Sequence, residues 1–251
     1  MSVCICGERR ANFLFSSEGY KIVQCINCEQ VRTETPKNLK RTQFYRKDNF
    51  SIYIEKEAMF RALFGEKIAF IKQFRENGKL LDIGAGVGLL VSEAKKAGYT
   101  VVGLEPSKSA VSAAKKYFGV SLLQNEFSEK LFMNSFDVIV LNHALEHLPN
   151  PKEVINDANK ALQREGLLVI GVPNFGSYLS ILKRDRWQSL IPDQHRWHFT
   201  LKTLDQFVTP FGFERQAVSW ENHDRAMHNW WKKPIYWTLD QIALRTGFAE
   251  A

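Results

Sequence analysis

From residue 79 onward, short apolar runs alternate with amphipathic segments. Runs of strand length occur at 79–83, 100–105, 120–123, 136–141 and 167–172. Segments with helical spacing lie between them at 90–97, 106–117 and 151–162, and Gly98 and Gly119 end the first two. Near-continuous apolar strands separated by helices are typical of a parallel sheet covered on both faces. The pattern predicts an α/β fold with a doubly wound, mostly parallel sheet and helices on both faces.

The flanking segments are less regular. Helical spacing runs from Glu55 to Phe74 and stops at Asn77-Gly78, after a polar stretch over 33–42 that reads as a linker. Tyr45 and Tyr53 in this region either close over a bound ligand or pack the linker. At the other end we expect a helix from Thr200 to Val208, a strand over 213–220 and a helix over 235–244. We identify no seventh strand.

All four cysteines lie in the first 28 residues, as C-x-C and C-x-x-C separated by eighteen residues. Two short strands, 13–15 and 20–24, flank Ser-Ser-Glu-Gly, and such a hairpin would bring both cysteine pairs together. Disulfides are the alternative, but the expected cytoplasmic location disfavours them. We predict a zinc-ribbon-like module whose structural Zn²⁺ has a closed shell of four thiolates. The predicted ligands are Cys4, Cys6, Cys25 and Cys28.

These patterns divide the chain into three parts. Residues 1–35 form the zinc-binding module, 36–78 the linker and lid helices, and 79–251 the main domain. Within that domain, 175–200 is an insertion rich in apolar and aromatic residues and crossed by Lys183-Arg184-Asp185-Arg186. It suits either a cap over a hydrophobic or glycosyl acceptor with an acidic group, or an ordinary insertion packed on the sheet.

Charge narrows the range of partners. The formal net charge of +7 lies outside the central region, since residues 79–182 hold ten Lys or Arg and ten Asp or Glu. No charged and apolar leader opens the sequence, and no apolar run approaches the roughly 20 residues of a membrane helix. We therefore expect a cytoplasmic protein without a membrane partner. Trp230, Trp231, Tyr236 and Trp237 could line a homodimer contact or the acceptor site.

The chemistry is concentrated after the first strand of the main domain. Asp82 is followed by glycines at 84, 86 and 88, which reads as strand, tight turn and helix N-terminus. Glu105 closes the next strand, where an acidic side chain can accept both hydroxyls of a ribose. The G-x-G-x-G spacing departs from the G-x-G-x-x-G of dinucleotide sites, and Asp82 disfavours a pyrophosphate. Together these features favour a cationic nucleoside ligand with an amino group.

Five motifs in order resemble class I S-adenosylmethionine-dependent methyltransferases, in particular a bacterial small-molecule branch with a four-cysteine zinc motif. They are residues 80–88, 102–107, 135–139, 146–151 and 172–174. The resemblance implies a Rossmann-like domain in which the turn at 82–88 holds the methionine part of the cofactor and Glu105 holds the ribose. It places 125–127 beside the adenine, and 142 and 143 beneath the sulfonium. The implied cofactor-binding residues are Asp82, Gly84, Ala85, Gly86, Gly88, Glu105, Pro106, Asn125, Glu126, Phe127, Asn142 and His143.

Two histidine clusters follow the fourth and fifth strands, at 143–147 and 195–198, and three roles compete for them. His195 or His143 could be the general base that removes the acceptor proton. His143, Glu146, His147 and His195 could instead hold a second, divalent metal. This set is similar to the Glu-x-x-Glu-His plus His of metal-dependent sugar, quinone and RNA methyltransferases, but His143 stands where the first Glu would be. The third role is structural, which we favour for His147 and His198.

The sequence therefore predicts an S-adenosylmethionine-dependent methyltransferase that methylates oxygen on a small molecule such as a sugar, a polyketide or another tailored metabolite. The enzymatic alternatives are an RNA methyltransferase, a metal-dependent O-methyltransferase and, more remotely, an NAD-dependent oxidoreductase. A nucleic-acid partner is disfavoured because no run of Lys and Arg with interleaved aromatic residues marks an RNA track. A cofactor-binding regulatory protein is the non-enzymatic alternative.

Overall fold

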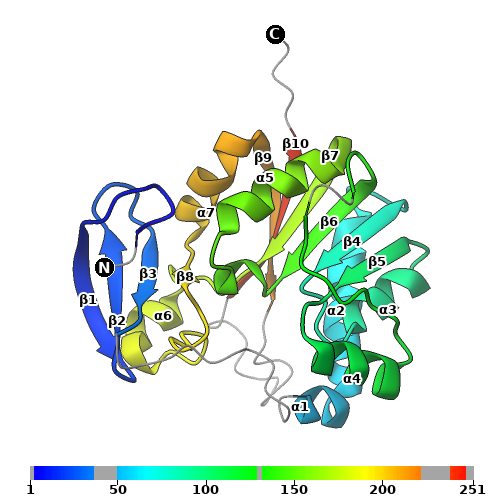
Figure 1. Ribbon diagram of the computed structural model, residues 1–251, viewed down its shortest axis with the longest axis horizontal. Helices are drawn as coiled ribbons and strands as arrows, with labels where there is room; N and C mark the ends of the chain where they lie inside the picture. The colour runs from blue at the N-terminus through cyan, green and yellow to red at the C-terminus, as the bar shows by residue number, and fades with distance from the viewer. Residues whose placement is uncertain (1–2, 37–49, 129–131, 222–237, 247–251) are drawn as a thin grey trace.

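The computed structural model describes residues 3–36, 50–128, 132–221 and 238–246, which form two sheets (Figure 1). The larger sheet has the order β5-β4-β6-β7-β10-β9, and the smaller has the order β1-β2-β3-β8. In Figure 1 the smaller sheet lies to the left of the larger one, beside α6 and β8. Mixed α/β architecture with a doubly wound sheet is confirmed.

Four of the six strands described for the larger sheet are parallel. They are β4 (Lys79–Ile83), β5 (Thr100–Leu104), β6 (Phe136–Asn142) and β7 (Leu162–Gly171). β4 pairs with β5 on one side and with β6 on the other. The chain therefore winds outward from β4 in both directions, and the carboxyl ends of β4 and β6 border the crevice where such sheets bind ligands.

The other edge of this sheet corrects one prediction. β10 (Thr238–Thr246) lies antiparallel between β7 and β9 (Phe213–Glu221). The segment expected to be helical over 235–244 is thus a strand from 238, and it supplies the seventh-strand position that the sequence did not reveal. Partners on both sides decide this conformation, because strand pairing outweighs local helical spacing. The expected strand at 120–123 is also wrong, since it is reduced to one bridge between Leu123 and Leu104.

Alternate residues along the parallel strands face different helices. Leu81, Ile139 and Leu168 belong to a cluster with α5 (Pro151–Ala161) and α7 (Leu201–Val208). Leu80 and Val138 belong to a second cluster with α2 (Glu57–Lys72) and α3 (Leu89–Lys96). The period-two alternation of strand side chains thus supplies an apolar surface to both helical layers. The remaining helices of the described residues are α1 (Ser51–Glu55), α4 (Lys108–Phe118), α6 (Tyr178–Lys183) and the 3₁₀ turns η2 (Leu145–His147), η3 (Arg184–Arg186) and η4 (Thr209–Phe211).

The N-terminal sheet contains the predicted hairpin, formed by β1 (Ala11–Ser17) and β2 (Tyr20–Cys25). β3 (Val31–Glu34) adds a third strand, so residues 33 and 34 of the predicted linker are in fact in a strand. The fourth strand, β8 (Trp197–His198), comes from the distant insertion and pairs with β3. This short strand therefore connects the cysteine-rich segment directly to the part of the chain that carries His195.

The insertion over 175–200 packs largely against the N-terminal sheet. Trp187 and Leu190 are buried in one cluster with Ile22 and Val31. None of the helices among the described residues is long and apolar enough to cross a membrane. Several expectations lie outside the described residues, namely those for Tyr45, Trp230, Trp231, Tyr236 and Trp237.

Candidate active site

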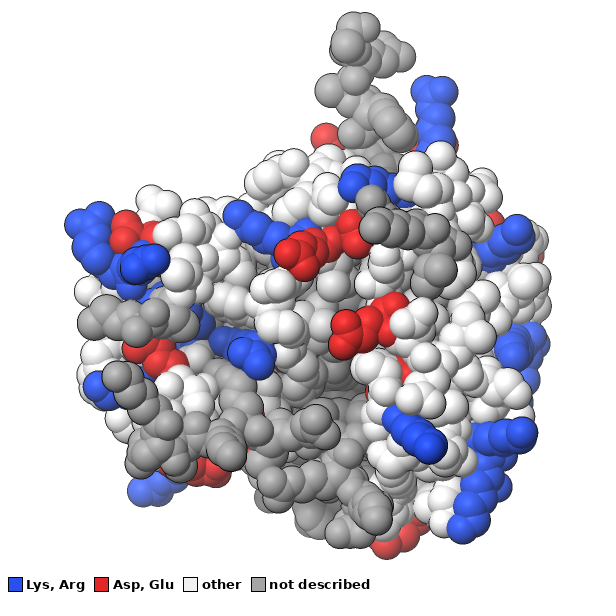
Figure 2. All heavy atoms as spheres, in the orientation of Figure 1, with Lys and Arg blue, Asp and Glu red and all other residues white. Residues whose placement is uncertain are grey.

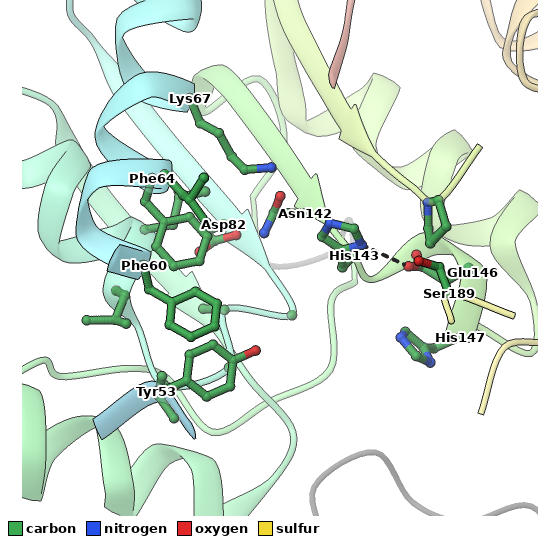
Figure 3. A pocket seen from close by; sticks show the side chains of 18 of the residues that line it. Tyr53, Phe60, Phe64, Lys67, Asp82, Asn142, His143, Glu146, His147 and Ser189 are labelled. Carbon is green, nitrogen blue, oxygen red and sulfur yellow. Dashed lines mark ion pairs between the residues drawn. The ribbon is translucent and has the colours of Figure 1, made fainter. Parts of the chain in front are cut away.

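A cavity of about 270 Å³ opens at the carboxyl edge of the larger sheet (Figure 3). Its walls come from α2, the glycine turn after β4, the segment after β6, and the insertion before β8. Figure 3 shows an acidic and aromatic side around Asp82 and a histidine side around Glu146. The structure thus brings together two groups of residues that are far apart in the sequence.

The glycine turn follows β4 as predicted. Gly84 and Gly86 have φ angles of 76° and 56°, in the left-handed region that disfavours residues with a Cβ. A Cβ on Gly84 would also stand 3.0 Å from the Cβ of Ala144. Glu105, at the end of β5, accepts a hydrogen bond from Gly86 N at 2.9 Å. This bond fixes the turn against β5, so Glu105 shapes the cavity wall from behind.

Two buried carboxyl groups dominate the electrostatics of this side. Asp82 is only 2% exposed. Burial, and secondarily the charge of Glu105, raises the pKa of Asp82 to about 7. Burial also raises the pKa of Glu105, although Gly86 N and Ser107 N both donate to its carboxylate. A cation in the cavity would stabilise the ionised form of both groups.

Two further polar groups line the same side. The amide oxygen of Asn142 is buried and accepts no hydrogen bond from the described part of the chain. Lys67 of α2 is 3% exposed, and Figure 3 shows its side chain reaching toward Asn142. Lys67 was not predicted as a site residue, because a lysine in an amphipathic helix ordinarily indicates a solvated face. The one available signal was its position beside Ile68 on the apolar stripe of α2.

Aromatic side chains from α1 and α2 form another wall. Tyr53 and Phe60 have ring centroids 4.5 Å apart, and Phe64 continues the row. The charge of Glu105 adds to the effect of burial in raising the pKa of Tyr53, so its hydroxyl remains neutral. Tyr53, one of the two tyrosines expected either to close over a ligand or to pack the linker, lines the cavity.

The histidine side begins immediately after β6. His143 has a φ of 51°, a costly value for a residue with a Cβ, and its N–H donates to Gly171 O at 2.9 Å. Its Nδ1 lies 3.3 Å from Oε1 of Glu146, the ion pair drawn in Figure 3. The rings of His147 and His195 lie edge to face with centroids 4.7 Å apart. All four side chains line the cavity.

The protonation states of Glu146 and the neighbouring histidines depend on how close these side chains lie to one another. Burial alone would raise the pKa of Glu146, but His143, His147 and His195 outweigh it and lower the pKa to about 2. Burial, reinforced by His147 and His143, lowers the pKa of His195 to about 4. Near pH 7, Glu146 is therefore an anion and His195 a neutral imidazole. A base this weak is poorly matched to proton removal near neutrality.

Several predicted cofactor residues do not line this cavity. Gly88 is the N-cap residue just before α3. A Cβ there would lie 2.7 Å from Cγ1 of Val120, so close packing is enough to require glycine at this position. Glu105 stands behind the turn. The other predicted residues outside the lining are Pro106, Asn125, Glu126 and Phe127.

The four cysteines converge as predicted. The Sγ atoms of Cys4 and Cys28 are 3.6 Å apart, as are those of Cys6 and Cys25, and all four lie within 4.8 Å of one another. Thiolates bound to one tetrahedral Zn²⁺ at about 2.3 Å stand roughly 3.8 Å apart. Disulfide bonding would need sulfur atoms about 2 Å apart, and all four cysteines are free. The donor set therefore fits a structural Zn²⁺.

Comparison with known proteins agrees with this geometry. The methyltransferase domain family matches residues 56–218. A ubiquinone biosynthesis O-methyltransferase from Hydrogenovibrio crunogenus is 28% identical over 163 residues, which cover 60% of this chain and 65% of that relative. The chain thus spans less than two thirds of that relative's length.

Solved structures share the fold. A Listeria monocytogenes S-adenosylmethionine-dependent methyltransferase superposes with a TM-score of 0.58 at 14% identity, covering 76% of this chain and 100% of the other. The Burkholderia thailandensis 1,6-didemethyltoxoflavin-N1-methyltransferase, solved with S-adenosylhomocysteine, gives 0.59 at 15% identity, covering 89% and 98%. These structures and this chain share the fold of S-adenosylmethionine-dependent methyltransferases. The chain belongs to the methyltransferase domain family.

Proposed function

We propose that this protein transfers the methyl group of S-adenosylmethionine to an oxygen atom of a small molecule. One observation carries the proposal. A single cavity joins the glycine turn and buried Asp82 to the His143–Glu146 pair, so a donor and an acceptor can meet there. Methyl transfer is an in-line displacement on an already activated sulfonium, and it requires mainly alignment and removal of the acceptor proton.

The polar groups of the first side suit the zwitterionic end of the cofactor. Asp82 and the amide oxygen of Asn142 are acceptors for its ammonium group, and Lys67 is a cation for its carboxylate. The turn without side chains at Gly84 and Gly86 allows close approach of the ligand. Glu105 lies behind the turn and outside the cavity lining, but its carboxylate keeps lone pairs beyond its two backbone contacts, so a ribose that reached past the turn would find acceptors for its hydroxyls there.

His143 is the better placed of the two predicted bases. Its side chain is 28% exposed, whereas His195 is 4% exposed and uses Nδ1 in a contact with Ser189 O. Glu146 lies beside His143 and stabilises the imidazolium that forms when His143 takes the acceptor proton. The acceptor oxygen then forms its bond to the methyl carbon as the sulfur–carbon bond breaks.

Two observations favour an oxygen atom of a small molecule over RNA as the acceptor. The named relative is an O-methyltransferase of ubiquinone biosynthesis. On the face shown in Figure 2, Lys and Arg side chains of the described residues are scattered and form no continuous track. This argues for an enclosed acceptor site.

Calorimetry and turnover test the proposal together. Wild-type protein should bind S-adenosylmethionine, and incubation with a panel of phenols, catechols and sugars should produce S-adenosylhomocysteine. His143→Gln should retain cofactor binding and lower turnover on the accepted compound by about 10²-fold or more, the usual contribution of a general base. Failure of the wild type to bind the cofactor would refute the assigned class. Binding without turnover on any acceptor would favour the regulatory alternative.

The N-terminal part has a separate role in this proposal. Residues 1–35 hold one Zn²⁺ through Cys4, Cys6, Cys25 and Cys28, which folds a segment too small for its own core. Residues 36–78 supply the linker and the lid helices, and 79–251 form the methyltransferase domain. Four thiolates leave the ion no open position, so its contribution is structural.

A further inference from the structure

We propose that Glu146, His147 and His195 bind a divalent transition-metal ion at the acceptor end of the cavity; this site rests on the proposed methyl transfer and adds a metal to it. The three residues converge from two distant segments. One ligand atom from each lies within 4.8 Å of the other two. Their donor atoms, one carboxylate oxygen and two imidazole nitrogens, form a set typical of Mn²⁺, Co²⁺, Fe²⁺ and Zn²⁺ rather than of Ca²⁺ or Mg²⁺.

The state of Glu146 is the first observation in favour of the site. Its side chain is 1% exposed, and Oε1 lies 3.3 Å from Nδ1 of His143. Oε2 accepts no hydrogen bond from the described residues. A buried carboxylate requires paired charge or metal coordination to offset its desolvation. A cation beside Oε2 would meet that requirement.

The orientation of His195 is the second observation. Its Nδ1 is 3.0 Å from the carbonyl oxygen of Ser189, so Nδ1 carries the proton and donates it. The lone pair is then on Nε2, on the side of the ring opposite the Ser189 contact. A metal-binding histidine typically donates its other ring N–H to a backbone carbonyl in this way, which fixes both tautomer and ring direction.

The backbone holds the two contributing segments in place. Arg196 N donates to the carbonyl of Glu146 at 2.8 Å, which joins the residue after His195 to the 3₁₀ turn that carries Glu146 and His147. His195 N donates to Ile191 O at 2.8 Å. The three ligands therefore stand on two mutually bonded segments, which is the preorganisation that a metal site requires.

Three protein ligands leave coordination positions open, as in catalytic rather than structural sites. All three side chains line the cavity, so an open position faces the acceptor. An acceptor hydroxyl bound there would lose its proton more readily, and His143, beside Glu146, would receive that proton. The oxygen would then take the methyl group, and S-adenosylhomocysteine would leave.

Manganese binding tests the site without knowledge of the acceptor. The zinc-loaded protein should bind one Mn²⁺ per chain, seen as loss of the free Mn²⁺ signal in electron paramagnetic resonance. Glu146→Gln and His147→Gln should each weaken this binding at least tenfold, while near-ultraviolet circular dichroism checks the fold. Glu153→Gln, at an exposed position of α5, is the matched control and should bind like the wild type.

Cobalt distinguishes this site from the cysteines, because Co²⁺ bound to nitrogen and oxygen lacks the intense near-ultraviolet absorption that thiolate ligands produce. Absence of Mn²⁺ and Co²⁺ binding by the zinc-loaded wild type would overturn the inference, as would undiminished binding in Glu146→Gln. Cofactor binding measured on the same samples separates the two proposals. A protein that binds S-adenosylmethionine but no such ion retains the proposed function and loses only the metal.

Discussion

Ionised Asp82 destabilises the folded protein, because its carboxyl group is buried beside Glu105. Its pKa is raised from 3.8 to about 7 by burial first and Glu105 second. A group with a raised pKa stabilises the fold fully below its unfolded value, and that stabilisation is lost as pH rises through the folded value. The loss therefore accumulates between about pH 4 and pH 7. Because one pKa unit corresponds to about 1.4 kcal/mol, ionised Asp82 costs at most about 4 kcal/mol above pH 7.

Asp82→Asn should therefore stabilise the ligand-free protein and abolish its cofactor affinity. Urea unfolding at pH 8 should show a higher free energy of unfolding for the variant, and the gain should shrink as pH falls toward 4. Calorimetry should show loss of S-adenosylmethionine binding, because the amide offers no charge to the ligand's ammonium. A stability difference that does not change with pH would contradict the assigned pKa, and unchanged affinity would remove Asp82 from the site.

A role for Lys67 in cofactor binding is suggested by the structure and was not predicted from the sequence. If its ammonium holds the carboxylate of the methionine part, Lys67→Met should weaken S-adenosylmethionine binding by about 10-fold or more, as expected for losing a charge-assisted hydrogen bond. The variant should bind decarboxylated S-adenosylmethionine as well as the wild type does. Wild type should therefore discriminate between the two ligands, and the variant should not.

Lys72→Met on the same helix is the matched control for Lys67, since Lys72 donates to Ala97 O on the neighbouring helix α3. It should preserve both affinities and their ratio. Equal loss of both ligands in Lys67→Met would indicate a packing role for Lys67, because only a carboxylate contact distinguishes the two compounds.

At the scale of elements, β8 links the cysteine-rich N-terminal sheet to the histidine side of the cavity. Gln30 follows the Cys25-x-x-Cys28 turn, and its side-chain amide donates to His198 O at 2.9 Å. Thr33 N donates to Arg196 O at 3.0 Å, and Thr33 Oγ1 lies 2.8 Å from His198 Nε2. These contacts connect the residues that follow the Cys25-x-x-Cys28 turn to the segment that carries His195.

Removal of zinc should therefore loosen that segment selectively. After treatment with a strong chelator, amide hydrogen exchange should accelerate in peptides covering residues 20–34 and 195–199. Peptides covering β4 and β6 should keep their protection, because the larger sheet has its own core. Unchanged exchange at 195–199 would show that the module does not support the site, and full exchange throughout would show that the two sheets unfold as one unit.

The sequence was most informative where local pattern and tertiary environment agree. The central residues of β4, β5 and β6 and the second half of β7 are largely apolar because both faces of the sheet are covered, and the hairpin is marked by Glu18-Gly19 between apolar runs. β8 has two residues and exists only because β3 lies beside it, so no periodicity could reveal it. β10 shows apolar spacing compatible with a helix, and its strand state comes from pairing with β7 and β9. The same holds for the candidate site. Asp82 and His143 could be predicted because they stand at the ends of predicted strands, whereas Lys67 could not, because it enters the cavity from a helix.

For the whole molecule, the distribution of charge favours a small-molecule acceptor over RNA. The net charge is +7, but residues 79–182 are balanced, and the basic excess divides into +5 before them and +2 after them. The cavity itself holds buried Asp82 and Glu146 rather than a basic groove. Among the described residues on the face shown in Figure 2, the Lys and Arg side chains are scattered and form no continuous surface for a polyanion. The field of the molecule therefore favours a small acceptor that enters the cavity.

Salt dependence tests this reading. Each phosphate contact adds close to one unit to the slope of log affinity against log salt, with about 0.7 per contact for single strands. Fluorescence anisotropy with a labelled 30-nucleotide RNA should show no binding tighter than about 1 μM at 150 mM salt, the range of non-specific contacts. Affinity for S-adenosylmethionine should change little between 50 and 200 mM salt, because its charged partners are buried and weakly screened. Submicromolar RNA binding with a slope equivalent to six or more contacts would instead support the RNA methyltransferase, since the scattered lysines and arginines would then have to act as one surface.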